Sequence, residues 1–310
     1  MRVAELVERV LAGDRRGIAR AISMVEDGAD GLAELSAGIY PRTGNAYSVG
    51  LTGSPGVGKS SLAEQLVRAA RARERSVAVL AIDPTSPFTG GALLGDRLRM
   101  QAHATDPEVF IRSMATRGHL GGMALAAPEA IRILDASGAD VVVIETVGVG
   151  QAEVEVATAA DTTLVVVSPG WGDSVQVSKA GILEIADVFV VNKADREGAG
   201  EAGRDLRVML TMGPQGGWKP PVVLTSTVTG AGMDDLWDAI ESHRKHQEAG
   251  GELDRRRRER LLREVRTMAA ERLRGRIGDL LSAEEADALA ERRLDPYRAV
   301  DILLQRVTGA

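Results

Sequence analysis

The sequence of 310 residues contains no cysteine, which excludes disulfides, thiolate metal sites and a cysteine nucleophile. Histidine is scarce as well. Of the four in the chain only His243 and His246 lie close together, and we expect them at an exposed polar helix end rather than at a metal ion. Tryptophan, tyrosine and phenylalanine occur three times each, and the net charge is −6. A nucleic-acid surface needs a basic field and stacking rings, so we expect no nucleic-acid partner.

Long hydrophobic runs are also missing, since no stretch approaches the roughly eighteen apolar residues that a membrane helix needs. The first residues, Met1 to Glu5, are typical of an amphipathic helix start and not of a signal peptide. We therefore expect a cytoplasmic protein without a membrane partner. Positive charge is concentrated only in the run Arg255–Arg258, whose acidic neighbours Glu252 and Glu259 favour a solvated helix face.

What the sequence does contain is a phosphate-binding loop. Residues 53–60, GSPGVGKS, match the pattern G-x-x-x-x-G-K-[ST] between an apolar run at 47–52 and a helical pattern. The glycines let backbone N–H groups turn toward phosphate oxygens, Lys59 neutralises phosphate charge, and the Ser60 hydroxyl is placed to ligate Mg²⁺. A glycine-rich turn without a ligand is the alternative, which the strand–loop–helix context disfavours. The residues expected to hold the nucleotide here are Gly53, Ser54, Pro55, Gly56, Val57, Gly58, Lys59, Ser60 and Ser61.

A second motif indicates which nucleotide binds. The apolar run 188–191 ends in Asn192-Lys193-Ala194-Asp195, the N-K-x-D pattern of guanine-binding proteins. The Asp195 carboxylate can accept both N1–H and the exocyclic N2–H of guanine, a pair of donors that adenine lacks on one edge. Asn192 can brace the loop, and the Lys193 stem can lie on the base face. A polar turn at a strand exit is the alternative, but the position downstream of a P-loop favours GTP and GDP as ligands.

Apolar segments that alternate with helical patterns indicate the fold class. Continuously apolar stretches such as 141–144 and 164–167 are typical of parallel strands covered on both faces. We expect an α/β fold with a doubly wound, mostly parallel sheet of the P-loop NTPase kind. It should comprise an N-terminal helical extension at 1–40 that packs on the main domain, a GTPase domain at 41–248 and a C-terminal helical arm at 249–310. The expected strands are 47–52, 77–82, 109–112, 140–145, 162–168, 187–191 and 222–225.

The C-terminal arm holds an apolar stripe at helical spacing. Such a stripe, outside a domain that is already complete, needs a partner surface. Packing on the nucleotide domain is one option. Pairing with a second copy is the favoured one, because twofold dimers are the commonest soluble oligomers, and we therefore expect a homodimer. The stripe consists of Leu261, Leu262, Val265, Met268, Ala269 and Leu273.

Carboxylates stand at the ends of two expected strands. Asp83 follows the segment 77–82, and Glu145 closes the segment 140–145. A carboxylate at such a strand end binds Mg²⁺ directly or through water, because a hard cation prefers oxygen ligands. Gly148 completes an E-x-x-G pattern, and its N–H is placed to sense the γ-phosphate.

Two further residues are candidates for catalysis. Asp96 follows a glycine-rich segment and could enter the site on closure, although an exposed pair with Arg97 is the alternative. Val149 occupies the position where Ras-type GTPases have their catalytic glutamine, and Gln151 is the nearby candidate for orienting water. We expect slow hydrolysis in the absence of a partner, because water positioning and charge stabilisation are incomplete.

In their order along the chain these motifs resemble those of the MeaB/ArgK group, the methylmalonyl-CoA mutase-associated GTPases of the metallochaperone P-loop class. The resemblance extends over residues 1–310, including the helix at 16–26 and the tail Asp295-Pro296-Tyr297. The sequence of residues 174–179 departs from the one that is usual for the third switch segment of that group. The matching segments are Ser54–Ser60, Asp83–Pro87, Thr89–Arg97, Phe110–Gly118, Glu145–Gln151 and Asn192–Asp195.

The resemblance implies a GTPase that gates adenosylcobalamin loading and reactivation of an acyl-CoA mutase such as methylmalonyl-CoA mutase. Hydrolysis of GTP to GDP and phosphate would be the switch, and the protein would form a homodimer through its C-terminal arm. Ser226, Thr227 and Val228 match the loop that contacts the base. The residues that match the phosphate and Mg²⁺ positions are Lys59, Ser60, Asp83, Asp96 and Glu145, with Asp195 as the guanine reader.

Other functions stay open at this point. A nickel-delivery GTPase would share both nucleotide motifs, but it would normally also carry Cys or His clusters for the ion. A nucleotide-dependent scaffold with little hydrolysis is compatible with the missing glutamine, and phosphate release with and without a partner would separate it from a switch. A small-molecule kinase would need an acceptor site, and the sequence indicates none.

Overall fold

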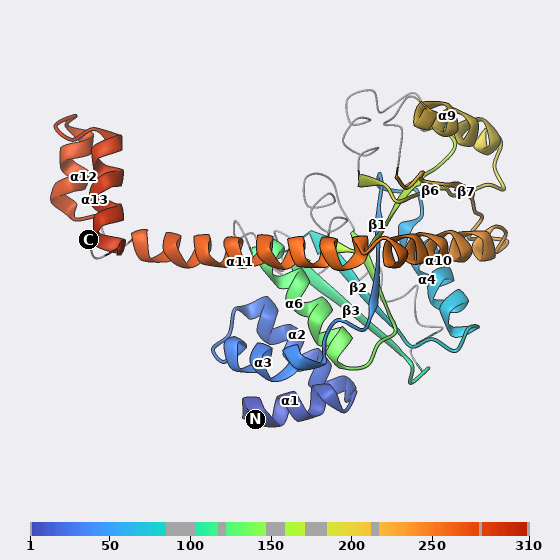
Figure 1. Cartoon of the computed structure of the whole chain (residues 1–310), viewed down its shortest axis with the longest axis horizontal. Coiled ribbons are helices and arrows are strands. Elements are labelled where there is room, and N and C mark those ends of the chain that lie inside the picture. Colours follow the sequence, from blue (N-terminus) through green and yellow to red (C-terminus); the bar gives the residue numbers. More distant parts are fainter. Residues whose placement is uncertain are drawn as a thin grey trace. The chain divides into compact units, whose positions relative to one another are not determined.

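In the part of the chain that it describes, the computed structural model contains one sheet of seven strands flanked by helices (Figure 1). The strand order is β3-β2-β4-β1-β5-β6-β7, and every pairing is parallel. This confirms the predicted doubly wound α/β fold and all seven predicted strands, although β3 is longer than expected. The strands are β1 (Tyr47–Thr52), β2 (Val77–Pro84), β3 (Val109–Thr116), β4 (Val141–Thr146), β5 (Thr162–Val167), β6 (Val188–Val191) and β7 (Val222–Leu224).

Helices precede, connect and follow these strands. They are α1 (Val3–Leu11), α2 (Arg15–Asp27), α3 (Leu32–Ile39), the short 3₁₀ helix η1 (Tyr40–Arg42), α4 (Lys59–Arg71), α6 (Gly122–Ala136), α9 (Ala199–Thr211), α10 (Met233–Ala249), α11 (Glu252–Gly278), α12 (Ala283–Ala290) and α13 (Pro296–Thr308). The structure describes residues 2–84, 103, 105–116, 122–146, 159–170, 185–211, 217–278 and 281–308. In this part of the chain no helix combines the length and the apolar character that crossing a membrane requires.

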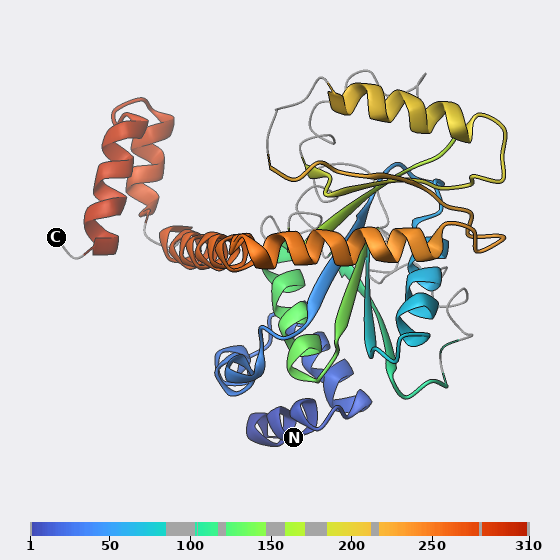
Figure 2. The same cartoon turned by 45° about the vertical axis from the view of Figure 1, so that its right-hand side comes forward.

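Both faces of the sheet are covered, which explains why its central strands are apolar throughout. In β4, Val141 and Val143 join a core cluster with α4 and α10, whereas Val142 and Ile144 join a second cluster with α6 and the N-terminal helices. Figure 2 shows α4 and α6 on opposite sides of the strands. Since successive side chains of a strand point to opposite faces, burial on both faces requires apolar residues at every position.

The N-terminal helices belong to this second cluster. Leu6 of α1 and Ile22 of α2 are fully or almost fully buried, and they share the cluster with Leu80 of β2 and Ile133 of α6. This packing confirms that the first helices lie on the sheet domain, as we expected of helices too short to be stable alone.

By its internal contacts the chain divides into two compact units, residues 1–257 and residues 258–310. The boundary falls inside α11, whose first residues belong to the first unit. Leu253 is buried in the core cluster beside Ile240 of α10. In the second unit, α12 begins with the capping box predicted at Ser282: its hydroxyl accepts from the Glu285 backbone N–H, and the Glu285 carboxylate accepts from the Ser282 N–H.

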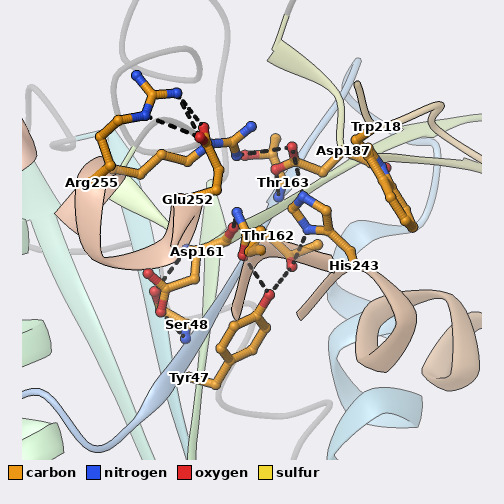
Figure 3. A network of polar contacts seen from close by, with 12 residues as sticks. Tyr47, Ser48, Asp161, Thr162, Thr163, Asp187, Trp218, His243, Glu252 and Arg255 are labelled. Atoms are coloured by element: carbon orange, nitrogen blue, oxygen red, sulfur yellow. Dashed lines mark hydrogen bonds and ion pairs between the residues drawn. The ribbon is translucent and has the colours of Figure 1, made fainter. Parts of the chain in front are cut away.

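A buried polar network lies at the amino ends of β1, β5 and β6 (Figure 3). His243 of α10 is fully buried there, with Nδ1 2.8 Å from the Thr162 hydroxyl and Nε2 3.2 Å from Asp187 Oδ1. The Thr162 hydroxyl lies 2.6 Å from the hydroxyl of Tyr47. The prediction of an exposed helix end is therefore wrong for His243, although it holds for His246. The spacing of the two histidines along one helix could not predict the partners of His243, because these partners lie in or beside strands that are distant in the sequence.

Two arginines of α11 complete this network. Arg257 Nη2 lies 2.6 Å from an oxygen of Asp161, and Arg256 Nη1 lies 3.0 Å from an oxygen of Asp187. Each of these carboxylates also accepts a backbone N–H, from β1 and β5 respectively. The predicted solvated face is therefore wrong for Arg257, holds in part for Arg256, whose side chain is 37% exposed, and is correct for Arg255 and Arg258, which are exposed. The carboxylates at the strand starts turn two of the arginines inward.

Candidate functional site

The P-loop follows β1 at the carboxyl edge of the sheet, where β1 lies between β4 and β5. Three of its glycines have positive φ angles: 139° at Gly53, 79° at Gly56 and 98° at Gly58. A Cβ on Gly53 would lie 2.1 Å from the carbonyl oxygen of Val166, and one on Gly58 would lie 2.4 Å from Asn192 Nδ2. Glycine is therefore required at these two positions by backbone conformation and by space.

Lys59 and Ser60 form the first turn of α4, directly after the loop. The Lys59 ammonium group donates to the Gly53 carbonyl and lies 3.4 Å from the Ser54 carbonyl oxygen, so it stays over the loop. The positive end of α4 points to the same place. A fixed cation, a helix N-terminus and the backbone N–H groups of a glycine-rich loop therefore lie together. These are the groups that binding a polyphosphate requires.

Ser60 contacts the predicted metal carboxylate. Its hydroxyl donates to Glu145 Oε1, and both side chains are buried. Glu145 reaches this position because β4 runs parallel to β1, with Glu145 in register with Leu51 just before the P-loop. The described residues hold no group of three His, Cys, Asp or Glu side chains that could bind a metal. A hydroxyl and a carboxylate nevertheless fit Mg²⁺, because this hard cation takes its other ligands from phosphates and water.

Several predicted site residues cannot be compared with the structure. Asp83 lies near the end of β2, in register with Ala115, and its side chain is outside the described part of the chain. Asp96, Gly148 and Gln151 lie outside the described residues, as does the segment 174–179. Their roles stay predictions.

The N-K-x-D segment follows β6 and contacts the P-loop directly. The Asn192 side chain is fully buried; it donates to the Val57 carbonyl at 2.9 Å and accepts from the Thr225 hydroxyl at 3.3 Å. The Lys193 ammonium donates to the Gly56 carbonyl at 2.6 Å, and the backbone φ of Lys193 is 60°. Because this φ is uncommon for lysine, tertiary contacts must hold the turn. The two sequence motifs thus form one connected site.

Asp195, the predicted guanine reader, lies against the loop that follows β7. The Ser226 hydroxyl donates to Asp195 Oδ1 at 2.5 Å, and the Ala194 N–H donates to the Thr225 carbonyl at 2.9 Å. The Ser226 hydrogen bond is the main cause that lowers the pKa of Asp195 below its ordinary value of 3.8. Asp195 is therefore an ionised acceptor at neutral pH. Val228 lies at the tip of the same loop and is 84% exposed.

One contact of the site was not predicted from the sequence. Gln65 of α4 donates from Nε2 to the Thr227 carbonyl at 3.2 Å, which ties the P-loop helix to the loop after β7. Gln65 belongs to neither nucleotide motif. In the sequence it is only a polar residue close to Leu62 and Leu66, two apolar residues of the same helix that are buried in the structure.

Comparison with known proteins gave consistent matches. A protein-family model described as methylmalonyl-CoA mutase-associated GTPase MeaB matches residues 18–280. A putative GTPase of Pyrococcus abyssi is 48% identical over 315 residues, which cover 99% of this chain and 97% of the relative. The GTPase ArgK of Escherichia coli is 34% identical over 294 residues, which cover 92% of this chain and 88% of the relative. A crystal structure of a LAO/AO transport system kinase has a TM-score of 0.74 and 25% identity, and the match covers 99% of this chain and 97% of that one.

Proposed function

This chain belongs to the MeaB family of methylmalonyl-CoA mutase-associated GTPases, and we propose that it is a GTP-hydrolysing chaperone of an adenosylcobalamin-dependent acyl-CoA mutase. In this proposal the nucleotide state gates loading of the cofactor and removal of inactivated cofactor. Family membership establishes a P-loop GTPase. The description of the family supports methylmalonyl-CoA mutase as the partner.

The observation that supports guanine as the base is the position of Asp195. Its carboxylate is ionised and held by Ser226, in a segment whose Asn192 and Lys193 donate to P-loop carbonyls. A base bound beside the P-loop would meet an acceptor that can pair with N1–H and N2–H of guanine. Adenine would leave that carboxylate without matching donors, so we propose that the site prefers GTP and GDP.

We assign the phosphate chemistry to residues of the P-loop and of β4. Lys59 is proposed to bind the β- and γ-phosphates, while the glycine-bordered backbone N–H groups surround them. Ser60 and Glu145, joined by a hydrogen bond, are proposed to hold Mg²⁺, with Asp83 and Asp96 as the other candidates. Bound Mg²⁺ would neutralise charge on the phosphates. Glu145 is shielded from solvent, which keeps this pairing in a low-dielectric environment.

We propose that hydrolysis is slow until the mutase binds. Gln151 is the proposed residue for orienting water, and Gly148 is proposed to sense the γ-phosphate. Since the position after Gly148 is Val149 and not a glutamine, water positioning would depend on a rearrangement that the partner stabilises.

We further propose that the protein is a homodimer through residues 258–310. In this unit Leu262, Val265 and Leu304 are each about half exposed or more, at 49%, 61% and 50%. Side chains of this size and number are rarely left in water on the helices of a monomer. A second copy would cover them.

The partner assignment can be tested with purified methylmalonyl-CoA mutase. The immobilised chain, loaded with GDP or with a slowly hydrolysed GTP analogue, is mixed with the mutase, and phosphate release from GTP is measured with and without mutase. We expect retention that depends on the nucleotide and a rate increase of at least about tenfold, as for other partner-assisted GTPases. The variant Lys59→Ala should stay folded and lose turnover.

Three results would contradict parts of the proposal. Mutase retention without any change in phosphate release would indicate a scaffold. No retention in either nucleotide state would reject this mutase as the partner. Equal affinities for ATP and GTP in a calorimetric titration would reject guanine recognition.

A further inference from the structure

Helix α4 reaches both ends of the nucleotide site. Its first turn carries Lys59 and Ser60, and the side chain of Gln65, further along, donates to the Thr227 carbonyl at 3.2 Å. Gln65 is half-buried, and this hydrogen bond joins residues separated by 162 positions in the sequence. The phosphate-binding helix and the loop beside Asp195 are thus connected through one side chain.

The loop that accepts this hydrogen bond is a tight turn with a free tip. The Ser226 N–H donates to the Ala231 carbonyl at 3.0 Å, and the Gly230 N–H donates to the Ser226 carbonyl at 2.8 Å. The backbone N–H groups of Thr227 and Val228 make no hydrogen bond within the part of the chain that the structure describes. The turn therefore presents two backbone donors next to the residue that holds Asp195.

The Gln65 hydrogen bond fixes the direction of one of these donors. A trans peptide unit is planar, so the Thr227 carbonyl and the Val228 N–H point in opposite directions. Because Gln65 holds the carbonyl on α4, the Val228 N–H points away from α4. Without this bond the peptide unit would be free to rotate, since neither of its polar groups has another partner in the described residues.

A backbone donor on the loop that holds the Asp195 carboxylate would match a particular base edge. Guanine has a carbonyl oxygen, O6, next to N1–H and the N2 amine, so it offers one acceptor and two donors in a row. Adenine has an amine in place of O6, and that amine would face the backbone donor. The direction of the N–H groups at the loop tip would therefore contribute to the choice between the two bases.

We propose that Gln65 is a positioning residue for guanine specificity. It touches no base atom in this proposal, and it acts by holding the peptide unit between Thr227 and Val228. The inference rests on the proposed GTP-binding function and adds that recognition of the 6-position depends on a side chain of the phosphate-binding helix.

The test compares four variants with the unchanged protein. Gln65→Ala removes the contact, Gln65→Glu keeps the shape but removes the N–H donor, and Gln65→Lys restores a donor of similar reach. The matched control is Glu64→Gln, because Glu64 is the adjacent residue of the same helix and pairs with the half-exposed Arg68 at 2.7 Å. Thermal unfolding midpoints establish that each variant is folded.

The probes are GDP, 6-thio-GDP, IDP and ADP, with affinities from displacement of a fluorescent GDP. Sulfur is a weak acceptor, so 6-thio-GDP reports recognition of the 6-position, whereas IDP lacks the N2 amine and reports pairing with Asp195. We expect Gln65→Ala and Gln65→Glu to weaken GDP binding by about twofold to tenfold. They should also reduce the preference for GDP over 6-thio-GDP and over ADP, while the preference for GDP over IDP stays. Gln65→Lys should recover much of the loss, and Glu64→Gln should behave as the unchanged protein.

Two results would overturn the inference while leaving the proposed function intact. One is an unchanged preference for GDP over 6-thio-GDP in Gln65→Ala and Gln65→Glu. The other is an equal loss of the 6-thio-GDP and IDP preferences, which would indicate a general loosening of the site. If the unchanged protein itself shows no preference for GDP over ADP, the proposed function fails, and this inference fails with it.

Discussion

At the residue scale, the short hydrogen bond between Ser226 and Asp195 holds the carboxylate that we propose to read the base. It helps keep the pKa of Asp195 below the usual range, so the side chain is an acceptor at neutral pH. The substitution Asp195→Asn would place amide N–H groups against the donors of guanine. Two donors of the bound base would lose their partners, so we expect GTP affinity to fall about 100-fold or more.

The same substitution should favour xanthosine triphosphate, because xanthine carries a carbonyl where guanine carries the N2 amine. Calorimetric titrations of both nucleotides would measure the exchange of preference. Asp205→Asn, on the exposed side of α9, serves as the control. If Asp195→Asn binds GTP as tightly as before, Asp195 does not read the base.

His243 provides a second prediction at the same scale, concerning pH. Burial lowers the pKa of His243 below its ordinary value of 6.5; Arg256 and His246 lower it further, and Asp187 and Asp161 raise it in part. As pH falls through 6.5, the unfolded chain takes up this proton before the folded one does. Stability from this group is therefore complete above about pH 6.5 and decreases below it, with a slope of up to about 1.4 kcal/mol per pH unit.

Urea denaturation at pH 7.5 and at pH 5.5 would measure this decrease in the free energy of unfolding. In His243→Asn the decrease should be smaller, although the protein starts from a lower stability because the contacts with Thr162 and Asp187 change. His246→Asn, on the exposed side of the same helix, is the control: it removes only one of the smaller causes of the lowered pKa of His243, so it should keep most of the slope of the unchanged protein. An identical slope in all three proteins would show that His243 is not the titrating group.

At the scale of secondary-structure elements, the first turns of α11 are anchored to the amino ends of the strands. Asp161 is 2% exposed in its side chain and pairs with Arg257, which also donates to the carbonyls of Gly44 and Ala46. The substitution Arg257→Ala would remove the guanidinium partner of this buried carboxylate. We expect the free energy of unfolding to fall by about 2–3 kcal/mol, less than for a fully buried pair, because Arg257 itself is about a quarter exposed.

The neighbouring Arg255 offers a matched control. It pairs with Glu252 on the surface, where its side chain is 61% exposed, and Arg255→Ala should change the free energy of unfolding by less than about 1 kcal/mol. Equal effects of the two substitutions in chemical denaturation would mean that the pairing with Asp161 does not stabilise the helix.

The elements also show what could be predicted from the sequence and why the rest could not. The position of Glu145 followed from an apolar run ending in a carboxylate, since a parallel sheet brings all such ends to one edge. The inward turn of Arg257 could not be predicted, because it depends on Asp161, which is distant in sequence and precedes another strand. The role of Gln65 could not be predicted for the same reason. A local pattern predicts only which residues of the same helix lie close together, and the partner of Gln65 is Thr227, in the loop after the last strand.

At the scale of the whole molecule, the division at Arg257 decides where the chain can be cut. The arm predicted from the sequence begins at 249, but Leu253 is part of the core cluster, and Arg256 and Arg257 pair with buried carboxylates. A chain ending at Arg257 keeps these contacts, whereas a chain ending at Gly250 loses them. We therefore expect the longer truncation product to fold and to bind GDP like the full chain, and the shorter one to unfold at a lower temperature.

The truncation after Arg257 also tests the proposed homodimer. Residues 258–310 contain the whole apolar stripe, and their removal should convert a dimer into a monomer that still binds GDP, because the P-loop and Asp195 lie in the first unit. Light scattering of the full chain and of residues 1–257 would measure the change in mass.

A full-length monomer would contradict the dimer, and a dimeric 1–257 fragment would place the interface in the first unit. A monomeric, folded 1–257 fragment that no longer binds GDP would show instead that the nucleotide site needs residues beyond Arg257. The exposed side chains expected to become covered in the dimer include Leu261, Leu262, Val265, Met268 and Leu273.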